Sequence, residues 1–398
     1  MYYYIMYIYI IILPNMESPF VFGQIARGKS FINRTSELQH LVGNFASGTN
    51  TMVIAPRRWG KSSLVNRAGG MAGREDRKLK ICSLDLFRVR DEAHFFEVFA
   101  QAVLKASSGR WQEWVSIAKE LLKGLVSSVS IGTDPVNEFR LKLSWESASR
   151  DEKTILDLPE KIARKKKIRF IICIDEFQKI TGFRDSLFLQ QRLRSHWQDQ
   201  SLTSYCLYGS KRHMITELFT SKSQPFYQFG DLIFLQKIEE SYWERFMERQ
   251  FKNTGKSIEK EVIGMIIQVA ANHPYHVQQL AHYVWGHTGD RATPEIFRKS
   301  LDELLAHNEI LFKREVEHLT ALQLNYLEAL VQGEKHLNSS ETIRTYNLGS
   351  PGNLGTIKSA LETKEIIDFY EMEPMFVNPL FEYWLKTRYF PYASGQFL

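Results

Sequence analysis

The chain has 398 residues, which predicts two or three domains, and its 44% hydrophobic and 24% charged residues are the proportions of an ordinary soluble globular protein. Three cysteines, none in a C-x-x-C pair, exclude a disulfide framework and disfavour structural zinc, so we expect a reducing, cytoplasmic environment. The 51 Lys and Arg residues against 45 Asp and Glu leave a net charge of +6, which permits a nucleic-acid partner without arguing for one.

The first residues need a separate interpretation. Met1–Leu13 is almost entirely Tyr, Ile and Met, and Pro14 ends the run. This stretch is shorter than the roughly 20 residues that a membrane-crossing helix needs, and it lacks the basic region and cleavage site of a secretory signal. No other apolar run approaches that length, so we expect no integral membrane span. We interpret residues 1–15 as a mis-assigned start or a disordered arm, with a β-prone or membrane-touching arm as the alternative.

From Met16 the sequence alternates short apolar runs with stretches of helical periodicity, which predicts an α/β fold with a parallel sheet between helices. The pattern blurs between Trp111 and Ser149, which we interpret as an insertion. The expected strands are Thr51–Ala55, Lys80–Phe87, Ile168–Ile174, Ser204–Tyr208 and Leu232–Leu235, and the expected helices are Lys61–Ala68, His94–Lys105 and Leu187–Trp197.

After Ile238 the strand signals stop and helical spacing dominates, which predicts a small helical domain. From Thr320 the order becomes helix, helix, helix and hairpin, which is the order of a winged helix. The expected helices of the small domain are Ser241–Phe251, Lys260–Ala270, Tyr275–Trp285 and Pro294–Ala306, and those of the winged helix include Thr320–Val331 and Asn353–Thr363, before a hairpin at Ile366–Val377.

The strongest chemical signal lies between the first predicted strand and the helix after it, where the sequence reads Ala-Pro-Arg-Arg-Trp-Gly-Lys-Ser-Ser. A P-loop needs this context, because its backbone N–H groups and the helix N-terminus together surround a polyphosphate. Lys61 would reach the β- and γ-phosphates, and Ser62 would supply a hydroxyl to Mg²⁺. Ala55 stands where the motif has its first glycine, which adds strain only if the turn requires a positive φ. A turn with a surface lysine is the alternative. The residues predicted to bind the nucleotide are Ala55, Pro56, Arg57, Arg58, Trp59, Gly60, Lys61, Ser62 and Ser63.

Two carboxylates, Asp175 and Glu176, end the third predicted strand, at the edge where open α/β sheets bind ligands. Asp175 is predicted to order Mg²⁺ and Glu176 to polarise an attacking water. Acidic residues also end strands and cap helices for structural reasons, so this motif gains its meaning from the P-loop. The separation of Lys61 and Asp175 favours a topology with an extra strand between the two motifs.

Ser210 follows the fourth predicted strand and is our candidate to contact the γ-phosphate or orient water. Lys211 and Arg212 are further contributors of charge. A serine that caps the next helix is an equal alternative. No N-K-x-D signature of guanine recognition occurs in the sequence, so ATP is the expected nucleotide.

Seven separated motifs then occur in order along the chain. They are Phe20-Val-Phe-Gly23, Phe31-Ile-Asn-Arg34-x-x-Glu37-Leu38, the Ala-Pro-Arg-Arg-x-Gly-Lys-Ser loop, Ile174-Asp-Glu-Phe-Gln178, Gly209-Ser-Lys-Arg-His-Met214, Pro225-Phe-Tyr227 and His273-Pro-Tyr275. Together they resemble the archaeal-type ATPase family, P-loop proteins of the STAND/AAA-like ASCE division that also occur in bacteria. The resemblance covers Met16–Tyr389 and implies an ATPase core, a helical lid and a winged helix.

The resemblance also implies nucleotide contacts outside the P-loop. The segment around Arg34 is expected near the adenine, and the His273-Pro274 turn is expected to begin a lid helix that faces the nucleotide. Phe20 and Phe22 are carried over in the same way.

The chain departs from the family pattern at Tyr227-Gln228-Phe229, where many relatives have Tyr-Gly-Arg, so an arginine finger is absent there. Arg192 and Arg194, on the helix after the carboxylates, are the candidates to replace it, and a merely solvated role is the alternative for both. Asn378-Pro379 stands where relatives often have Asp-Pro, which we expect to affect packing and not chemistry.

Two features could indicate nucleic-acid binding, the basic segment Lys161–Arg169 and the predicted winged helix, and each has another explanation. Lys161–Arg169 falls at a predicted helix C-terminus, where cations are favoured by the helix dipole. From Thr320 onward the chain has six basic and nine acidic residues, and Lys358 is the only base of the presumed recognition helix. A protein-contact or autoinhibitory role for the winged helix is therefore at least as plausible as groove binding.

These observations predict a P-loop ATPase domain at 16–237 with an insertion near 111–149, a helical lid at 238–315 and a winged helix at 316–398. We expect a Mg²⁺-dependent, ATP-binding switch that hydrolyses ATP slowly, with a protein partner of unknown identity or a second copy of the chain. The alternative is an ATP-gated DNA-binding module of a mobile-element or defence system.

Overall fold

The structure is a computed structural model that describes residues 17–26, 28–130, 132, 134, 139–143, 148–370 and 373–390. The interpretation of residues 1–15 as a mis-assigned start or arm lies outside these residues, as does part of the insertion. The chain divides into two compact units: the sheet unit, Arg34–Gln236, and the helical unit, which joins the residues before Arg34 to Lys237–Leu398.

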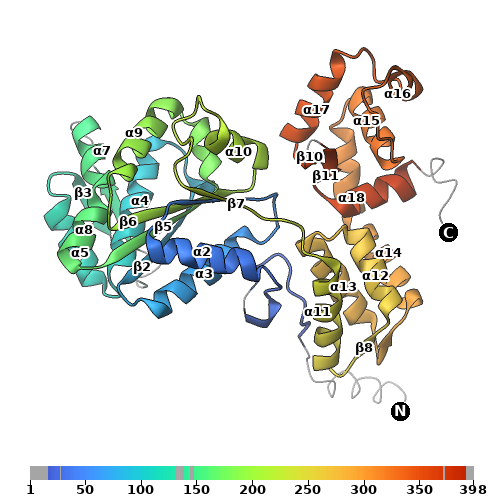
Figure 1. The fold of residues 1–398 in the computed structure, drawn as a ribbon, viewed down its shortest axis with the longest axis horizontal. Coiled ribbons are helices and arrows are strands. Elements are labelled where there is room, and N and C mark those ends of the chain that lie inside the picture. The colour runs from blue at the N-terminus through green and yellow to red at the C-terminus, as the bar shows by residue number, and fades with distance from the viewer. Residues whose placement is uncertain are drawn as a thin grey trace. The chain divides into compact units, whose positions relative to one another are not determined.

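The sheet unit is built on five parallel strands, which confirms the predicted sheet (Figure 1). Their order is β2-β5-β6-β1-β7, so β6 lies between the strand that precedes the predicted P-loop and the strand that ends in the two carboxylates. The spacing of the two motifs had predicted this extra strand. The strands are β1 (Thr51–Ile54), β2 (Leu79–Asp85), β5 (Arg169–Asp175), β6 (Thr203–Gly209) and β7 (Asp231–Phe234).

The central strands are covered by helices on both faces, which is why they read as continuous apolar runs. Helices α2 and α3 lie together on one face, with α9 and α10 on the other (Figure 1). Every residue of β6 is buried, and Ile172 and Ile174 of β5 join the core that Phe99 of α4 and Trp197 of α9 fill. The elements around the sheet are α2 (Thr35–Ser47), α3 (Lys61–Glu75), η2 (Leu86–Arg88), α4 (Glu92–Ser107), α8 (Leu158–Lys166), η3 (Phe177–Gly182), α9 (Ser186–Gln198) and α10 (Arg212–Thr220).

Among the described residues, the predicted insertion holds a helix and a short antiparallel ribbon, and a second helix begins at its end; these elements pack against α4 and its neighbours. Trp114 anchors it: the indole Nε1–H donates to the Ser108 carbonyl at 2.7 Å, and the ring meets Phe139 edge-on at 5.4 Å. The insertion therefore extends the core of the sheet unit and does not form a separate body. Its elements are α5 (Trp111–Leu121), β3 (Val126–Ser130), β4 (Arg140–Leu143) and α7 (Ala148–Leu156).

The basic segment Lys161–Arg169 covers the last turn of α8, and four of its cations pair with carboxylates. Arg164 pairs with Glu160 one turn earlier, and two lysines pair with glutamates of α5. This arrangement favours the helix-terminus interpretation of the segment. The lysine pairs are Lys165–Glu120 and Lys166–Glu113.

The helical unit has the predicted helices and then the helix, helix, helix and hairpin order of a winged helix. Trp384 packs on Phe312 and Phe381, which joins the last helix to the long α14. A two-residue parallel pairing of β8 with β9 was not predicted, because runs that short carry no periodicity. The elements are η1 (Gly28–Ser30), α11 (Glu240–Asn253), β8 (Ser257–Ile258), α12 (Lys260–Ala270), α13 (Pro274–His287), β9 (Arg291–Ala292), α14 (Pro294–Glu317), α15 (Ala321–Val331), α16 (Ser340–Thr345), α17 (Asn353–Thr363), β10 (Ile367–Tyr370), β11 (Glu373–Phe376), α18 (Pro379–Trp384) and the π-helix η4 (Leu385–Tyr389).

The segment before Arg34 belongs to the helical unit, although the sequence suggested a single domain from residue 16 to 237. Phe20 is buried against Phe246 and Phe251 of α11, and the Val21 N–H donates to Gln278 of α13 at 2.9 Å. These contacts explain the grouping. Among the described residues, no helix has the length and apolar composition needed to cross a membrane.

Candidate functional site

The strands β1, β5 and β6 bring their carboxyl ends to one edge of the sheet. Ile54 at the end of β1 is paired with Gly209 at the end of β6, and Ile174 of β5 is paired with Leu207 of β6. Because the strands are parallel and in register, the residues that follow them meet at this edge. The structure thus brings together the segments of Ala55, Asp175 and Ser210, which the sequence predicted to act at one site.

The loop after β1 turns sharply before α3 begins. Gly60, the N-cap of α3, has a φ of 88°, in the left-handed region that favours glycine. Nothing lies within 4 Å of a Cβ built on Gly60, so its backbone conformation and not crowding requires the glycine. Arg58 also has a positive φ of 63°, whereas Ala55 does not. Alanine in place of the first glycine of the motif is therefore harmless here.

Lys61 is the first residue of α3 and turns its side chain back into the loop. Its ammonium donates to the carbonyls of Ala55 at 2.8 Å and Pro56 at 2.7 Å. Only 5% of the residue is exposed, and burial lowers the pKa of Lys61 to about 8, against the opposing pull of Asp175 and Glu176. The lysine is thus held inside the loop, and the alternative of a surface lysine is wrong.

Ser62 joins the loop to the carboxylates of β5. Its Oγ–H donates to Asp175 Oδ2 at 2.8 Å, and the backbone N–H of Glu176 donates to Asp175 Oδ1 at 2.8 Å. Burial raises the pKa of Asp175 to about 6 in spite of these two hydrogen bonds. Mg²⁺ is usually held by one or two carboxylates together with phosphate oxygens and water, so the Ser62 hydroxyl and Asp175 carboxylate fit this ion.

Glu176 leaves the strand in the left-handed conformation, with a φ of 54° and a ψ of 39°. This unusual backbone at a non-glycine residue turns the carboxylate toward β6. Glu176 Oε2 accepts a hydrogen bond from Ser210 Oγ at 2.9 Å and another from the Gln178 amide Nε2. Ser210 therefore meets Glu176 directly. Sequence reasoning gave Gln178 no role, since only the fold shows which way its amide points.

Arg34 is buried beside the phosphate loop, and its guanidinium connects the loop to two other segments of the chain; we call this set of contacts the Arg34 brace. The guanidinium donates to the Trp59 carbonyl at 3.2 Å, to the Gln236 carbonyl at 2.9 Å and to Glu37 at 2.9 Å. Only 3% of Arg34 is exposed, and burial lowers its pKa although the Glu37 carboxylate opposes this. Arg34 is thus tied to the P-loop through the Trp59 backbone, a link that its place in the sequence could not reveal.

The other predicted contacts fall in different environments. Trp59 and Ser63 are buried, and Arg57 and Arg58 are exposed. His273 caps α13 in the helical unit, where its ring meets His276 at 4.7 Å, and its predicted contact with nucleotide stays a prediction. In the same unit Phe22 packs on Tyr275 and His282, and Phe20 is a core residue.

Both candidate replacements for an arginine finger are engaged within the sheet unit. Arg192 pairs with Glu92 and Glu152 and lies over the Phe188 ring. Arg194 donates to the Pro225 carbonyl at 3.2 Å, and its guanidinium lies 4.8 Å from the centroid of the Phe229 ring. These contacts give each side chain a structural role.

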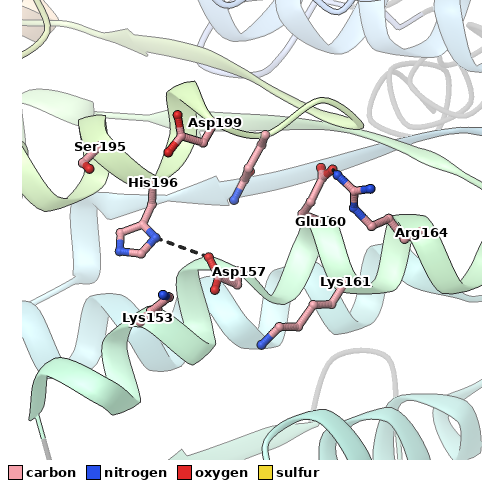
Figure 2. Close-up of a pocket in the computed structure, with 9 residues that line it drawn as sticks. Lys153, Asp157, Glu160, Lys161, Arg164, Ser195, His196 and Asp199 are labelled. Atoms are coloured by element: carbon pink, nitrogen blue, oxygen red, sulfur yellow. Dashed lines mark hydrogen bonds and ion pairs between the residues drawn. The ribbon is translucent and has the colours of Figure 1, made fainter.

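A pocket of about 500 Å³ lies at a different place, between α8 and α9 (Figure 2). Both helices end shortly before the first residues of β5 and β6, so the pocket lies near the strand starts, opposite the phosphate loop. Its lining carries both signs of charge, including His196 Nδ1 at 3.3 Å from Asp157 Oδ1. The pocket is therefore separate from the site at the strand ends.

The raised pKa of Asp175 has a consequence for stability. Above pH 6 the folded protein must keep a buried carboxylate ionised, so Asp175→Asn should raise the free energy of unfolding at pH 7 by roughly 2 kcal/mol. The gain should shrink toward pH 4, where the folded carboxyl is protonated. Denaturation with EDTA and without nucleotide measures it, with the exposed Asp199→Asn as control. A less stable Asp175→Asn protein at pH 7 would contradict the expectation.

The Arg34 brace can be tested in the same way. Arg34→Met removes the hydrogen bonds from the guanidinium to the Trp59 and Gln236 carbonyls and the ion pair with Glu37, so the free energy of unfolding should fall by about 2–4 kcal/mol. Thermal and urea unfolding measure the loss, with the exposed Arg77→Met as the matched control. Equal stability of the two variants would show that the brace contributes nothing.

No family model matches the sequence, and neither does any curated protein. The fold is similar to solved structures. A Walker-type ATPase of Pyrococcus abyssi matches with a TM-score of 0.59 and 16% identity, over 90% of this chain and 97% of the other. The ORC2 protein of Aeropyrum pernix matches in its ADPNP–ADP complexes with a TM-score of 0.54 and 14% identity, over 92% of each chain. Its ADP form matches with a TM-score of 0.50 and 13% identity, also over 92% of each chain. The chain has the fold of archaeal Walker-type ATPases, as the family resemblance predicted.

Proposed function

We propose that the protein binds ATP with Mg²⁺ and acts as a nucleotide-dependent switch with slow ATP hydrolysis. The observation that carries the proposal is the hydrogen bond from Ser62 Oγ to Asp175 Oδ2, beside the buried ammonium of Lys61. It joins a helix N-terminus, a lysine and a carboxylate at one sheet edge. These are the groups that bind and neutralise a metal-bound polyphosphate.

The phosphate-binding residues have distinct roles in this proposal. The backbone N–H groups at the start of α3 and the Lys61 ammonium bind the phosphates. The Ser62 hydroxyl and the Asp175 carboxylate would hold Mg²⁺, and this ion would neutralise the negative charge of the phosphates. Lys61 donates to two neutral carbonyls, and a charged phosphate oxygen is a stronger acceptor than either. The loop is thus built to exchange internal hydrogen bonds for bonds to a nucleotide.

Glu176 is the general base or water-orienting residue of the proposal, and Ser210 supports it. The Ser210 hydroxyl donates to Glu176 Oε2, which leaves the other carboxylate oxygen to accept from water. Proton abstraction by this oxygen would activate the water that attacks the γ-phosphate, and bond cleavage yields ADP and phosphate.

We expect slow turnover because the sheet unit has no arginine at position 229, where the family has its arginine finger. A guanidinium that stabilises the transferring phosphoryl group is worth a large factor in rate. Position 229 is phenylalanine, and Arg192 and Arg194 are held by contacts within the sheet unit. We infer a low basal rate that a second subunit or a protein partner completes.

The proposal includes a cytoplasmic location and does not extend to DNA. All three cysteines are buried free thiols, which suits a reducing compartment. In α17 the ammonium of Lys358, the sole base of that helix, donates to Asn338 Oδ1 at 3.0 Å. A groove-binding helix normally presents a basic face, so nothing here favours DNA over a protein partner.

Lys61→Ala tests the binding site. The variant should bind ATP about 10- to 100-fold more weakly, because hydrogen bonds to a charged group contribute roughly 1.5–3 kcal/mol. Titration with labelled ATP in the presence of Mg²⁺ measures the affinity. Lys222→Ala, at an exposed lysine of the same unit, should bind like the wild type. Equal affinity of wild type and Lys61→Ala would refute the site.

Glu176→Gln tests the chemistry. The substitution should keep ATP and Mg²⁺ affinity while turnover falls roughly 10²- to 10⁴-fold, the usual contribution of a positioned base. Single-turnover phosphate release with excess enzyme measures it, and Glu217→Gln at an exposed glutamate is the control. Any nucleotide-driven dimer should accumulate in the variant on gel filtration. Unchanged phosphate release would leave only nucleotide binding standing.

A further inference from the structure

We propose that Gln178 is a positioning residue for Glu176, which it holds so that one carboxylate oxygen alone is presented to water. This inference rests on the proposed ATPase function and deepens it. The amide Nε2 of Gln178 and the hydroxyl of Ser210 both donate to Glu176 Oε2. Two donors from different elements fix the carboxylate plane, since η3 carries the glutamine and the end of β6 precedes the serine.

The free oxygen of Glu176 is Oε1. In the part of the chain that the structure describes, both side-chain donors to this carboxylate reach Oε2. A carboxylate with one oxygen occupied by two donors and the other open accepts a proton at the open oxygen. An attacking water needs such a defined acceptor, because misplacement by about 1 Å can cost 10²-fold in rate.

Of the two orientations of the Gln178 amide, only the one that directs Nε2 at Glu176 is acceptable. The side chain is 97% buried, since the residue is 3% exposed, and its Oε1 has no hydrogen-bond partner among the described residues. A buried acceptor without a partner is unfavourable. Reversing the amide would place that oxygen against the Glu176 carboxylate, which is worse. The unsatisfied oxygen is thus the consequence of directing Nε2–H at Glu176.

Gly209 gives independent support from the neighbouring strand. A Cβ built on Gly209 would lie 1.8 Å from Gln178 Oε1, and 2.9 Å from both Gln178 Cδ and Ile215 Cδ1, so the amide oxygen is its nearest contact. Gly209 ends β6 without a positive φ, so its backbone does not require glycine. The space for the Gln178 amide requires it. The strand next to the carboxylates ends in glycine because the glutamine side chain passes there.

The alternative is that Gln178 only fills space. A packing role would affect stability and leave the rate of the chemical step alone. A positioning role would lower kcat with little change in KM, and it would vanish once Glu176 can no longer act as a base. The two roles therefore differ in kcat, and they differ again in a double-mutant cycle.

The experiment measures steady-state and single-turnover ATP hydrolysis, ATP affinity and thermal stability in the full chain. Gln178→Leu keeps the side-chain size and removes the donor, and it should lower kcat at least about tenfold while KM and ATP affinity stay within about twofold. Gly209→Ala displaces the amide from the other side and should reproduce the loss. Gln190→Leu is the matched control, because Gln190 of α9 is also 3% exposed, and it should keep the wild-type kcat.

The double variant completes the test. Adding Gln178→Leu to Glu176→Gln should cause no further loss of turnover, since the two residues act as one unit. An unchanged kcat in Gln178→Leu and Gly209→Ala, with Glu176→Gln inactive, would overturn the inference and leave the proposed function intact. An equal loss in both backgrounds would overturn it too. Wild-type turnover in Glu176→Gln would overturn the proposed function and this inference together.

Discussion

The hydrogen bond from Ser62 to Asp175 is the contact on which the site depends. It joins residues 113 positions apart, across the end of the strand that separates β1 from β5. It forms only because three parallel strands end level, and they end level because β6 is buried along its whole length and pairs with both neighbours. The register of an apolar strand thus sets the geometry of a polar site, since a slip by one residue would exchange the faces of every side chain.

Three ionisable groups lie around this contact, and each is satisfied differently: Arg34 and Lys61 are buried, and Asp175 is half-buried. Arg34 has two carbonyls and a carboxylate, Lys61 has two carbonyls, and Asp175 has a hydroxyl and a backbone N–H. Burying a charge is unfavourable unless such partners are present. Burial moves the pKa values of all three groups toward their neutral forms. On the proposed function, a metal-bound polyphosphate would pair with two of them, Lys61 and Asp175.

The sequence predicted the strands to within one or two residues, because buried parallel strands are short apolar runs with polar ends. It placed Asp175, Ser62 and Ser210 at one edge for the same reason. The sequence did not predict α2, and it ended α14 at Ala306 although the helix continues to Glu317. Helices that are largely exposed show a weaker hydrophobic periodicity. The Arg34 bond to the Trp59 carbonyl and the direction of the Gln178 amide could not be predicted, because both depend on side-chain orientation between distant segments. The family motifs contained Arg34 and Gln178, but a sequence motif does not show which atoms a side chain contacts.

On the proposed function, the site has more of the groups needed to bind ATP than of those needed to hydrolyse it. The loop, the metal-binding pair and the oriented Glu176 carboxylate are all formed within one compact unit. Phenylalanine stands at position 229, where the family has its arginine finger, and Arg192 and Arg194 are held by Glu92, Glu152 and the Pro225 carbonyl. Releasing Arg192 would leave two carboxylates without their partner, which is unfavourable. A cation from outside the unit faces no such penalty. On the proposed function, whatever supplies this cation would set the rate of hydrolysis, and the nucleotide-bound state would persist until then.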